Sequence, residues 1–176
     1  MDYSDIHIAK AKKIKLVIFD VDGVLTDGGL YFTDDGREIK KFNVKDGMGI
    51  SILVKKGIEV AVITGRSSVI VAERMKSLGV NHVYQGRMNK LETYENLKVA
   101  MNITDEEVAF VGDDIIDLPI MQRCSLSVAV ADAHQDVIKQ AALVLDKCGG
   151  MGAARDVCDL IMDAQGLYHD FTEGHQ

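Results

Sequence analysis

Residues 16–26 read Leu16-Val17-Ile18-Phe19-Asp20-Val21-Asp22-Gly23-Val24-Leu25-Thr26. The apolar run ends in two carboxylates spaced i and i+2, and a glycine follows. Such a continuous apolar run is typical of a buried strand in a parallel sheet. Because ligands bind beyond the carboxyl ends of the strands in open α/β sheets, we expect Asp20 and Asp22 to lie where chemistry occurs.

The close spacing of Asp20 and Asp22 itself indicates a function. Two carboxylates this near repel each other unless a cation lies between them or one of them holds a proton. Either arrangement is chemically useful, because one aspartate can act as nucleophile and metal ligand while the other carries a proton.

The composition is that of one soluble domain. The chain has 176 residues, enough for a full core, and 47% of them are hydrophobic, which excludes a disordered chain. It has 20 basic and 27 acidic residues, and the net charge of −7 argues against nucleic acid or an anionic membrane as the main partner. No signal-peptide pattern and no long apolar run are present, so we expect a cytoplasmic protein. The three cysteines lack CxxC spacing and are expected to be reduced thiols.

Beyond residues 16–26 the chain alternates between two kinds of segment. Apolar β-prone runs occur at Leu16–Phe19, Val60–Ile63, His82–Tyr84, Val108–Val111, Ser127–Val130 and Ala142–Leu145. Amphipathic helical segments lie between them at about Asp46–Lys56, Ser67–Leu78, Lys90–Met101, Ile115–Arg123 and Ala133–Gln140. This pattern predicts an α/β fold, a Rossmann-like parallel sheet with helices on both faces, as a single domain over residues 1–176.

One segment, residues 28–44, breaks this alternation. Two β-prone runs flank Asp34-Asp35-Gly36-Arg37, and Asp-Gly in such a position predicts a hairpin. A lone hairpin is marginally stable in water, so it must pack on its own core or on another subunit. We favour the subunit interface, because the arms carry four apolar side chains that would otherwise be exposed: Tyr31, Phe32, Ile39 and Phe42.

Polar residues follow three further strands of the predicted sheet. Thr64-Gly65-Arg66 offers a hydroxyl and a backbone turn for a phosphate oxygen, at the start of a helix whose N-terminus favours anions. Lys90 begins another helix, where its charge opposes the helix dipole, so a place beside anionic ligands explains it better than capping. In residues 112–117, Asp113 and Asp117 are four apart and share a face if the segment is helical.

The order and spacing of these segments indicate one site, although each alone is explained by a turn, a cap or a solvated surface. Together they supply a nucleophilic carboxylate, a proton carrier, carboxylates for a hard cation and two phosphate anchors. Oxygen ligands favour Mg²⁺ over zinc, which prefers His and Cys. The set predicts phosphoryl transfer through an aspartyl-phosphate, in which the metal and a lysine neutralise the phosphoryl oxygens.

The four segments resemble the motifs of the haloacid dehalogenase superfamily of phosphohydrolases over about residues 14–146. Residues 20–24 match its first motif, Thr64 its second, Lys90 its third, and Gly112-Asp113 with Asp117 its fourth. The resemblance implies a nucleophilic attack by Asp20. It implies that Asp22 protonates the leaving oxygen and then activates water.

The resemblance also implies how ligands are held. Asp20, the Asp22 backbone carbonyl and Asp113 would bind Mg²⁺, and Asp114 and Asp117 would tune or extend that site. The remaining expected contacts are with the substrate, because Thr64, Gly65, Arg66 and Lys90 would bind its phosphate.

The superfamily often inserts a cap domain after the first motif to close the site. Here only about 20 residues separate Gly23 from the predicted helix at Asp46, too few for an independent domain. We therefore expect a capless enzyme in which the hairpin of a neighbouring subunit excludes water.

A closer resemblance extends over nearly the whole chain, to the 3-deoxy-D-manno-octulosonate 8-phosphate (KDO 8-phosphate) phosphatases. It rests on Thr26-Asp27-Gly28, the hairpin, residues 42–50, residues 128–134 and the glycine-rich tail at 149–159. It implies a homotetramer whose hairpins form a central barrel, and a role in lipopolysaccharide biosynthesis. One position departs from the family pattern, because Met151 stands where a basic residue, able to meet the sugar-acid carboxylate, is frequent. Arg66 and Lys45 are then the candidates to bind that carboxylate.

Two other interpretations remain open at this stage. The substrate could be another sugar acid phosphate, such as a nonulosonate 9-phosphate. The chain could also be a non-catalytic oligomerising domain that activates a cytidylyltransferase, which the intact set of Asp20, Asp22, Lys90 and Asp113 disfavours.

Overall fold

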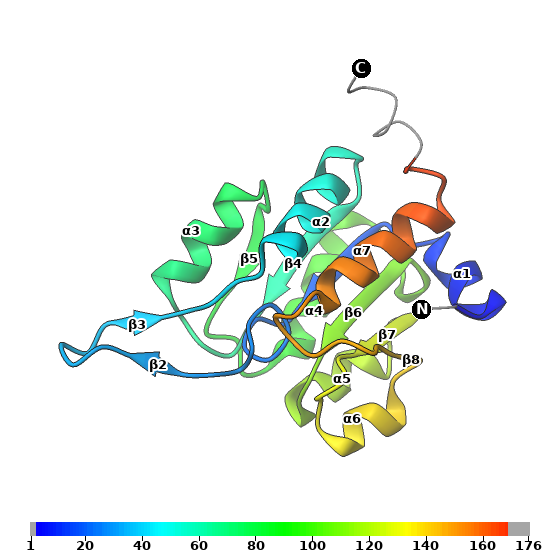
Figure 1. Ribbon diagram of the computed structural model, residues 1–176. Helices are drawn as coiled ribbons and strands as arrows, with labels where there is room; N and C mark the ends of the chain where they lie inside the picture. Colours follow the sequence, from blue (N-terminus) through cyan, green and yellow to red (C-terminus); the bar gives the residue numbers. More distant parts are fainter. Residues whose placement is uncertain (1–2, 169–176) are drawn as a thin grey trace.

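The computed structural model describes residues 3–168 and places them around one sheet (Figure 1). The sheet is parallel, with strand order β5-β4-β1-β6-β7-β8, and β2 and β3 form a separate antiparallel hairpin. The six strands of the sheet are β1 (Leu16–Phe19), β4 (Glu59–Ile63), β5 (His82–Tyr84), β6 (Val108–Gly112), β7 (Leu126–Ala129) and β8 (Leu143–Val144). This arrangement confirms the predicted Rossmann-like α/β fold.

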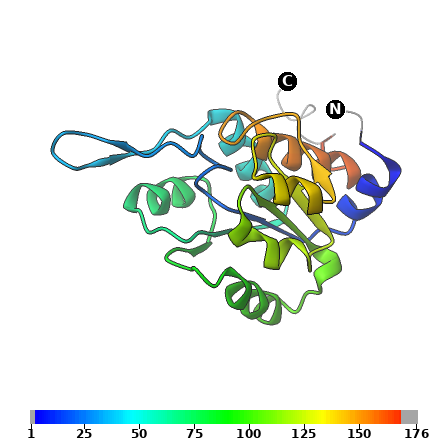
Figure 2. The same cartoon turned by 90° about the horizontal axis from the view of Figure 1, so that it is seen from below.

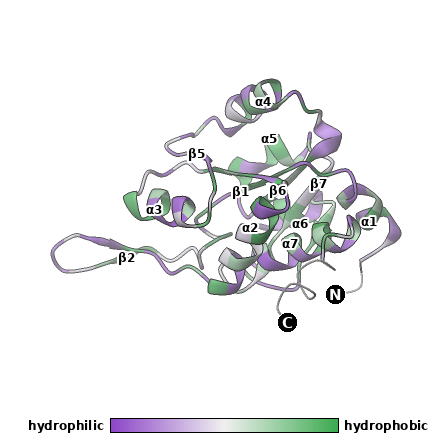
Figure 3. Ribbon diagram, turned by 90° about the horizontal axis from the view of Figure 1, so that it is seen from above, coloured by the Kyte–Doolittle hydropathy of each residue, from purple (hydrophilic) through white to green (hydrophobic). Residues whose placement is uncertain are grey.

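Helices cover both faces of the sheet, as predicted. α1, α2 and α7 lie on one face, and α4 and α5 lie on the other (Figures 2 and 3). The helices are α1 (Asp5–Ala11), α2 (Val44–Lys55), α3 (Val69–Ser77), α4 (Lys90–Met101), α5 (Leu118–Met121), α6 (Gln135–Gln140) and α7 (Ala153–Ala164), with 3₁₀ turns η1 (Asp105–Glu107) and η2 (Ile115–Asp117). Among the helices of residues 3–168, none is both long and apolar enough to cross a membrane.

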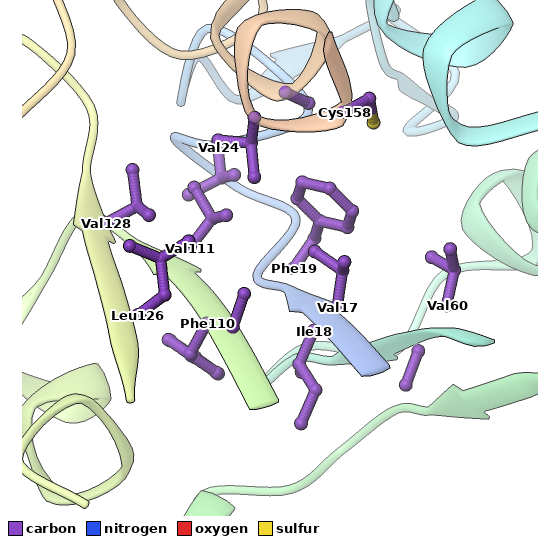
Figure 4. Packing of buried hydrophobic residues seen from close by; sticks show 14 of the residues in the cluster. Val17, Ile18, Phe19, Val24, Val60, Phe110, Val111, Leu126, Val128 and Cys158 are labelled. Carbon is purple, nitrogen blue, oxygen red and sulfur yellow. The ribbon is translucent and has the colours of Figure 1, made fainter. Parts of the chain in front are cut away.

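β1 lies at the centre of the sheet and is buried along its whole length. It pairs with β4 and with β6, so that Phe19 lies beside Val62 on one side and Val111 on the other. Phe19 lies beneath α7 near Cys158, whereas Ile18 points to the opposite face (Figure 4). Because both faces are buried, the strand has no polar position, which explains its uninterrupted apolar sequence.

Several element boundaries differ from the predicted ones. α2 begins at Val44 rather than Asp46, because the side chain of Asn43 accepts a hydrogen bond from the Lys45 amide at 2.8 Å and caps the helix there. The predicted helix over 115–123 divides into η2 and the short α5, with Pro119 in the first turn of α5. α1 lies outside the segments predicted to be helical.

The hairpin projects from the domain as a narrow ribbon (Figures 1 and 2). Its strands, β2 (Tyr31–Phe32) and β3 (Glu38–Ile39), are shorter than the sequence suggested. Tyr31, Phe32 and Ile39 are exposed, as predicted. The prediction was wrong for Phe42, which is half-buried and packs against the core of its own domain.

The glycine-rich tail packs tightly on the loop that follows β1. A Cβ atom added to Gly149 would lie 1.7 Å from the carbonyl oxygen of Gly23, and the Gly150 amide donates to the Val24 carbonyl at 2.9 Å. Residues 153–164 then form α7, which packs against α2 in the same chain. Met151 is exposed. Folding of the tail from Gly149 onward over a neighbour's site stays a prediction, and residues 169–176 of that tail lie outside the described residues.

Candidate active site

The candidate site lies at the carboxyl ends of β1 and β6, where the strand order changes direction. Asp20 follows β1 and Asp113 follows β6, so the two neighbouring strands deliver both carboxylates to one edge of the sheet. Gly23 brings the loop after β1 against Asp113, with a φ of +94°. A Cβ atom at this position would lie 2.1 Å from Asp113 Oδ2, so only glycine permits this approach.

Lys90 lies between two of the carboxylates. Its Nζ is 2.9 Å from Asp20 Oδ1 and 2.7 Å from Asp117 Oδ1, and all three residues are buried. Burial acts to lower the pKa of Lys90, but the charges of Asp20 and Asp117 outweigh it and raise this pKa above its usual value. Lys90 therefore stays charged beside Asp20, as a group that neutralises a phosphoryl oxygen must.

Asp117 organises the loop after β6. Its Oδ2 accepts hydrogen bonds from the amides of Asp113 at 3.0 Å and Asp114 at 3.3 Å, while its Oδ1 holds Lys90. Asp114 is exposed and caps η2, because its Oδ1 accepts the Ile115 amide at 2.7 Å. Asp113 and Asp117 thus meet because the Asp117 carboxylate accepts the Asp113 amide. The shared helix face expected for a helical segment does not form, because only Ile115–Asp117 adopt a 3₁₀ turn here.

Three carboxylates converge without enough positive charge to balance them. Asp20, Asp113 and Asp117 each offer an oxygen, and these atoms lie within 4.8 Å of one another. Asp113 Oδ1 is buried and accepts no hydrogen bond in the described part of the chain. Burial raises the pKa of Asp20 to about 6. Burial and then the charge of Asp20 raise the pKa of Asp113 to about 8. An all-oxygen set with an unpaired buried acceptor fits Mg²⁺.

Asp22 points toward the hairpin of its own chain. Lys40 Nζ forms an ion pair with Asp22 Oδ1, and Arg66 Nε lies 3.7 Å from Asp22 Oδ2. Glu38 completes the group, because its Oε1 lies 3.0 Å from Arg66 Nη2 and its Oε2 accepts from the Ser68 hydroxyl at 2.7 Å. The base of the ribbon thus reaches the second aspartate of the first motif.

The remaining predicted residues lie at different distances from this centre. Thr64 is buried and lies directly after β4, followed by Gly65. The Thr64 hydroxyl accepts a hydrogen bond from the Arg66 amide at 3.3 Å. Lys45 is exposed in the first turn of α2. No contact described within residues 3–168 joins the Lys45 side chain to the carboxylates.

Comparison with known proteins agrees with this geometry. Residues 79–154 match the haloacid dehalogenase-like hydrolases. The chain is 52% identical over 159 residues to the 3-deoxy-D-manno-octulosonate 8-phosphate phosphatase KdsC of Escherichia coli (strain K12), covering 90% of this chain and 85% of that protein. This chain belongs to the KDO 8-phosphate phosphatase family of haloacid dehalogenase-like hydrolases.

Solved structures of this family match the fold closely. The phosphatase of Moraxella catarrhalis, in complex with a magnesium ion, a phosphate ion and a KDO molecule, is 37% identical, with a TM-score of 0.95 and coverage of 99% of this chain and 100% of that one. The cobalt-bound phosphatase of Haemophilus influenzae is 43% identical, with a TM-score of 0.85 and coverage of 89% and 92%. Both were solved with bound metals.

Sequence reasoning missed two residues of this KDO 8-phosphate phosphatase site, Glu38 and Lys40. Both lie on the ribbon, with Lys40 Nζ 3.5 Å from Glu38 Oε1, while Ile39 between them is exposed. The sequence shows an apolar residue, Ile39, between two charged ones. This alternation is the signal that could have indicated a charged face on the ribbon. The contact of these charges with Asp22 depends on the path of the ribbon, which the local sequence does not encode.

Proposed function

We propose that the chain is a Mg²⁺-dependent phosphomonoesterase that hydrolyses KDO 8-phosphate to KDO and inorganic phosphate, a step of lipopolysaccharide biosynthesis. The observation that carries this proposal is the contact of Lys90 with Asp20 beside the three convergent carboxylates. The 52% identity to the E. coli phosphatase supports the choice of substrate.

Asp20 is the proposed nucleophile. Its carboxylate oxygen attacks phosphorus, the bond between phosphorus and the sugar oxygen breaks, and an aspartyl-phosphate forms. Asp22 gives its proton to the departing sugar oxygen. In the second step Asp22 takes a proton from water, the water oxygen attacks phosphorus, and inorganic phosphate leaves Asp20.

The other residues bind and neutralise the phosphoryl group. Lys90 already faces Asp20 and would meet a phosphoryl oxygen there. Thr64 and Gly65 would bind another oxygen at the end of β4, and Arg66 and Lys45 would face the sugar acid. Asp20, Asp113 and the Asp22 carbonyl would hold Mg²⁺, with Asp114 and Asp117 behind them. Bound Mg²⁺ would offset the negative charge that gathers on the phosphoryl oxygens.

Closure of the site is assigned to a second subunit. The whole chain, residues 1–176, acts as one capless domain, with its insert at about 28–44 and its tail at about 149–176. The exposed Tyr31, Phe32 and Ile39 support a homotetramer in which hairpins pair and bury these side chains. We assign the reaction to the cytoplasm, where the partners are the sugar acid phosphate and the other subunits of the homotetramer, with no nucleic acid and no membrane.

A phosphate-release assay over a panel of sugar acid phosphates with Mg²⁺ tests this proposal. We expect the highest kcat/KM for KDO 8-phosphate. A higher value for a nonulosonate 9-phosphate would replace the proposed substrate. An absence of release from every member, by a folded protein loaded with Mg²⁺, would refute a phosphatase function.

A further inference from the structure

Four charged side chains alternate around the proposed acid of the reaction. Lys40 Nζ contacts Asp22 Oδ1 and lies 3.5 Å from Glu38 Oε1. Arg66 contacts the same two carboxylates, with Nε 3.7 Å from Asp22 Oδ2 and Nη2 3.0 Å from Glu38 Oε1. Each cation therefore joins both carboxylates, and the four side chains form a closed ring of opposite charges.

Lys40 is buried in this ring although the ribbon around it is exposed. Its side chain is 2% exposed, whereas the side chain of Lys41, the next residue, is 59% exposed and lies 3.7 Å from Asp27. Burying a lysine costs rotamer freedom and the hydration of its charge. An exposed ion pair contributes little to stability and needs no such burial. The burial of Lys40 is therefore best explained by its contact with the Asp22 carboxylate.

We propose that Lys40 is a positioning residue that fixes the orientation of the Asp22 carboxyl group for proton transfer. The inference rests on the proposed function, in which the Asp22 proton moves to the sugar oxygen as the electron pair of the phosphorus–oxygen bond passes to that oxygen. Such a transfer requires the acid to lie within hydrogen-bond reach of the leaving oxygen. Lys40 on Oδ1 and Arg66 on Oδ2 restrict the rotation of the carboxyl group, and Glu38 keeps both cations in place.

The same ring connects the ribbon to the chemistry of its own subunit. Glu38 and Lys40 face the site, while Ile39 between them is exposed on the other face. Packing of Ile39 against another hairpin would hold the charged face of β3 over Asp22. The ribbon is thus a structural element of its own site as well as a surface for association.

The test compares Lys40→Met with wild type on two substrates that differ in their leaving groups. A sugar alkoxide needs a proton to leave, whereas the phenolate of an aryl phosphate such as p-nitrophenyl phosphate leaves without one. In single-turnover experiments, which isolate the first step, we expect Lys40→Met to slow release of the sugar by about 10- to 100-fold. Release of the phenolate should slow by less than about threefold, because general acid help is not needed there.

Two further variants separate positioning from simple structural support. Lys40→Arg keeps the cation and should restore most of the rate on the sugar phosphate. Lys41→Met is the matched control and should leave both rates unchanged. Light scattering and thermal unfolding must show the same assembly and a folded protein for every variant compared.

The comparison of the two leaving groups can also contradict the positioning role of Lys40. Equal slowing on both substrates, or no slowing on either, would overturn it. If Lys40→Met does not fold, Glu38→Gln takes its place, with a smaller slowing confined to the sugar phosphate expected and an equal slowing on both counting against the inference. If wild type is inactive on KDO 8-phosphate but cleaves another alkyl phosphate, the proposed substrate fails, and the comparison of leaving groups proceeds on that alkyl phosphate.

Discussion

The carboxyl-terminal edge of the sheet, where β1 and β6 end, and the projecting hairpin differ in which side chains they bury. At the edge, Asp20, Lys90 and Asp117 are buried and held in place by one another. On the ribbon, Phe32 and Ile39 are 60% and 50% exposed, with no core beneath them. Polar groups are buried where the chemistry occurs, and apolar groups are exposed where association is expected. The buried charged groups of the candidate site therefore all come from one chain, whereas we propose that a second chain encloses them.

The largest effect is expected from a change in the buried region that leaves the ribbon intact. Asp20→Asn should abolish turnover, because an amide cannot attack phosphorus, while thermal unfolding and light scattering stay as in wild type. Burial raises the pKa of Asp20 to about 6, so a neutral side chain is well tolerated by this environment. Phosphate release on KDO 8-phosphate measures the loss.

Asp34→Asn, at the exposed tip of the ribbon, is the matched control for Asp20→Asn and should keep full activity. More than a few per cent of wild-type turnover in pure, folded Asp20→Asn would rule out this residue as the nucleophile. The contrast between the two variants separates the edge of the sheet from the ribbon.

Metal removal should act on the same buried region. Chelation should eliminate activity, and added Mg²⁺ should restore it. Binding needs ionised carboxylates, yet burial and the charge of Asp20 raise the pKa of Asp113 to about 8, so this group holds a proton at pH 7 in the metal-free protein. Mg²⁺ must displace that proton, and the affinity should rise as the pH increases from 6 to 8. Calorimetry in buffers of different ionisation enthalpy measures the proton release.

Asp113→Ala tests the same point by mutation, since it should raise the Mg²⁺ concentration needed for activity steeply. An affinity for Mg²⁺ that falls between pH 6 and pH 8 would contradict the proposed role of Asp113. Full activity after complete chelation would contradict the metal requirement itself.

The sequence predicted the sheet and the site unequally well, for physical reasons. The apolar strand at 16–19 and the carboxylates after it are local features, so the fold and the meeting of Asp20 with Asp113 followed from strand order. The pairing of Lys40 with Asp22 depends on the path of the ribbon, which no local pattern encodes. Phe42 was misjudged for the same reason, because the chain turns back to its own core before α2 begins.

The exposed face of the ribbon predicts a smaller effect, confined to assembly and recognition. Phe32→Glu with Ile39→Glu should break the oligomer, because charges cannot be buried between apolar strands. We expect kcat/KM on KDO 8-phosphate to fall by at least about tenfold, equivalent to about 1.4 kcal/mol, as contacts that enclose the sugar are lost. Activity on a small generic phosphate ester should fall less, because it needs only the buried centre.

Val99→Glu is the control for the two ribbon charges, since Val99 is an exposed apolar residue on α4, away from the hairpin. This variant should keep the mass that wild type shows by light scattering. A wild-type monomer with full activity would refute closure by a second subunit.

The smallest effect is expected where the two regions join. Asp46 lies in the first turn of α2, just after the ribbon, and its carboxylate accepts the amides of Arg155 at 2.8 Å and Gly152 at 3.3 Å. It thus caps α7, which has no side-chain cap of its own at Gly152. Asp46→Ala should lower the free energy of unfolding by about 1–2 kcal/mol, because α7 loses its cap and the amides of Gly152 and Arg155 lose their hydrogen-bond acceptor. Urea unfolding measures this loss, and Asp136→Ala, in the exposed first turn of α6, provides the comparison.

Asp46→Ala leaves the centre at β1 and β6 unaltered, so it should retain the wild-type rate on a generic phosphate ester under native conditions. An unchanged free energy of unfolding would show that α7 does not depend on this cap.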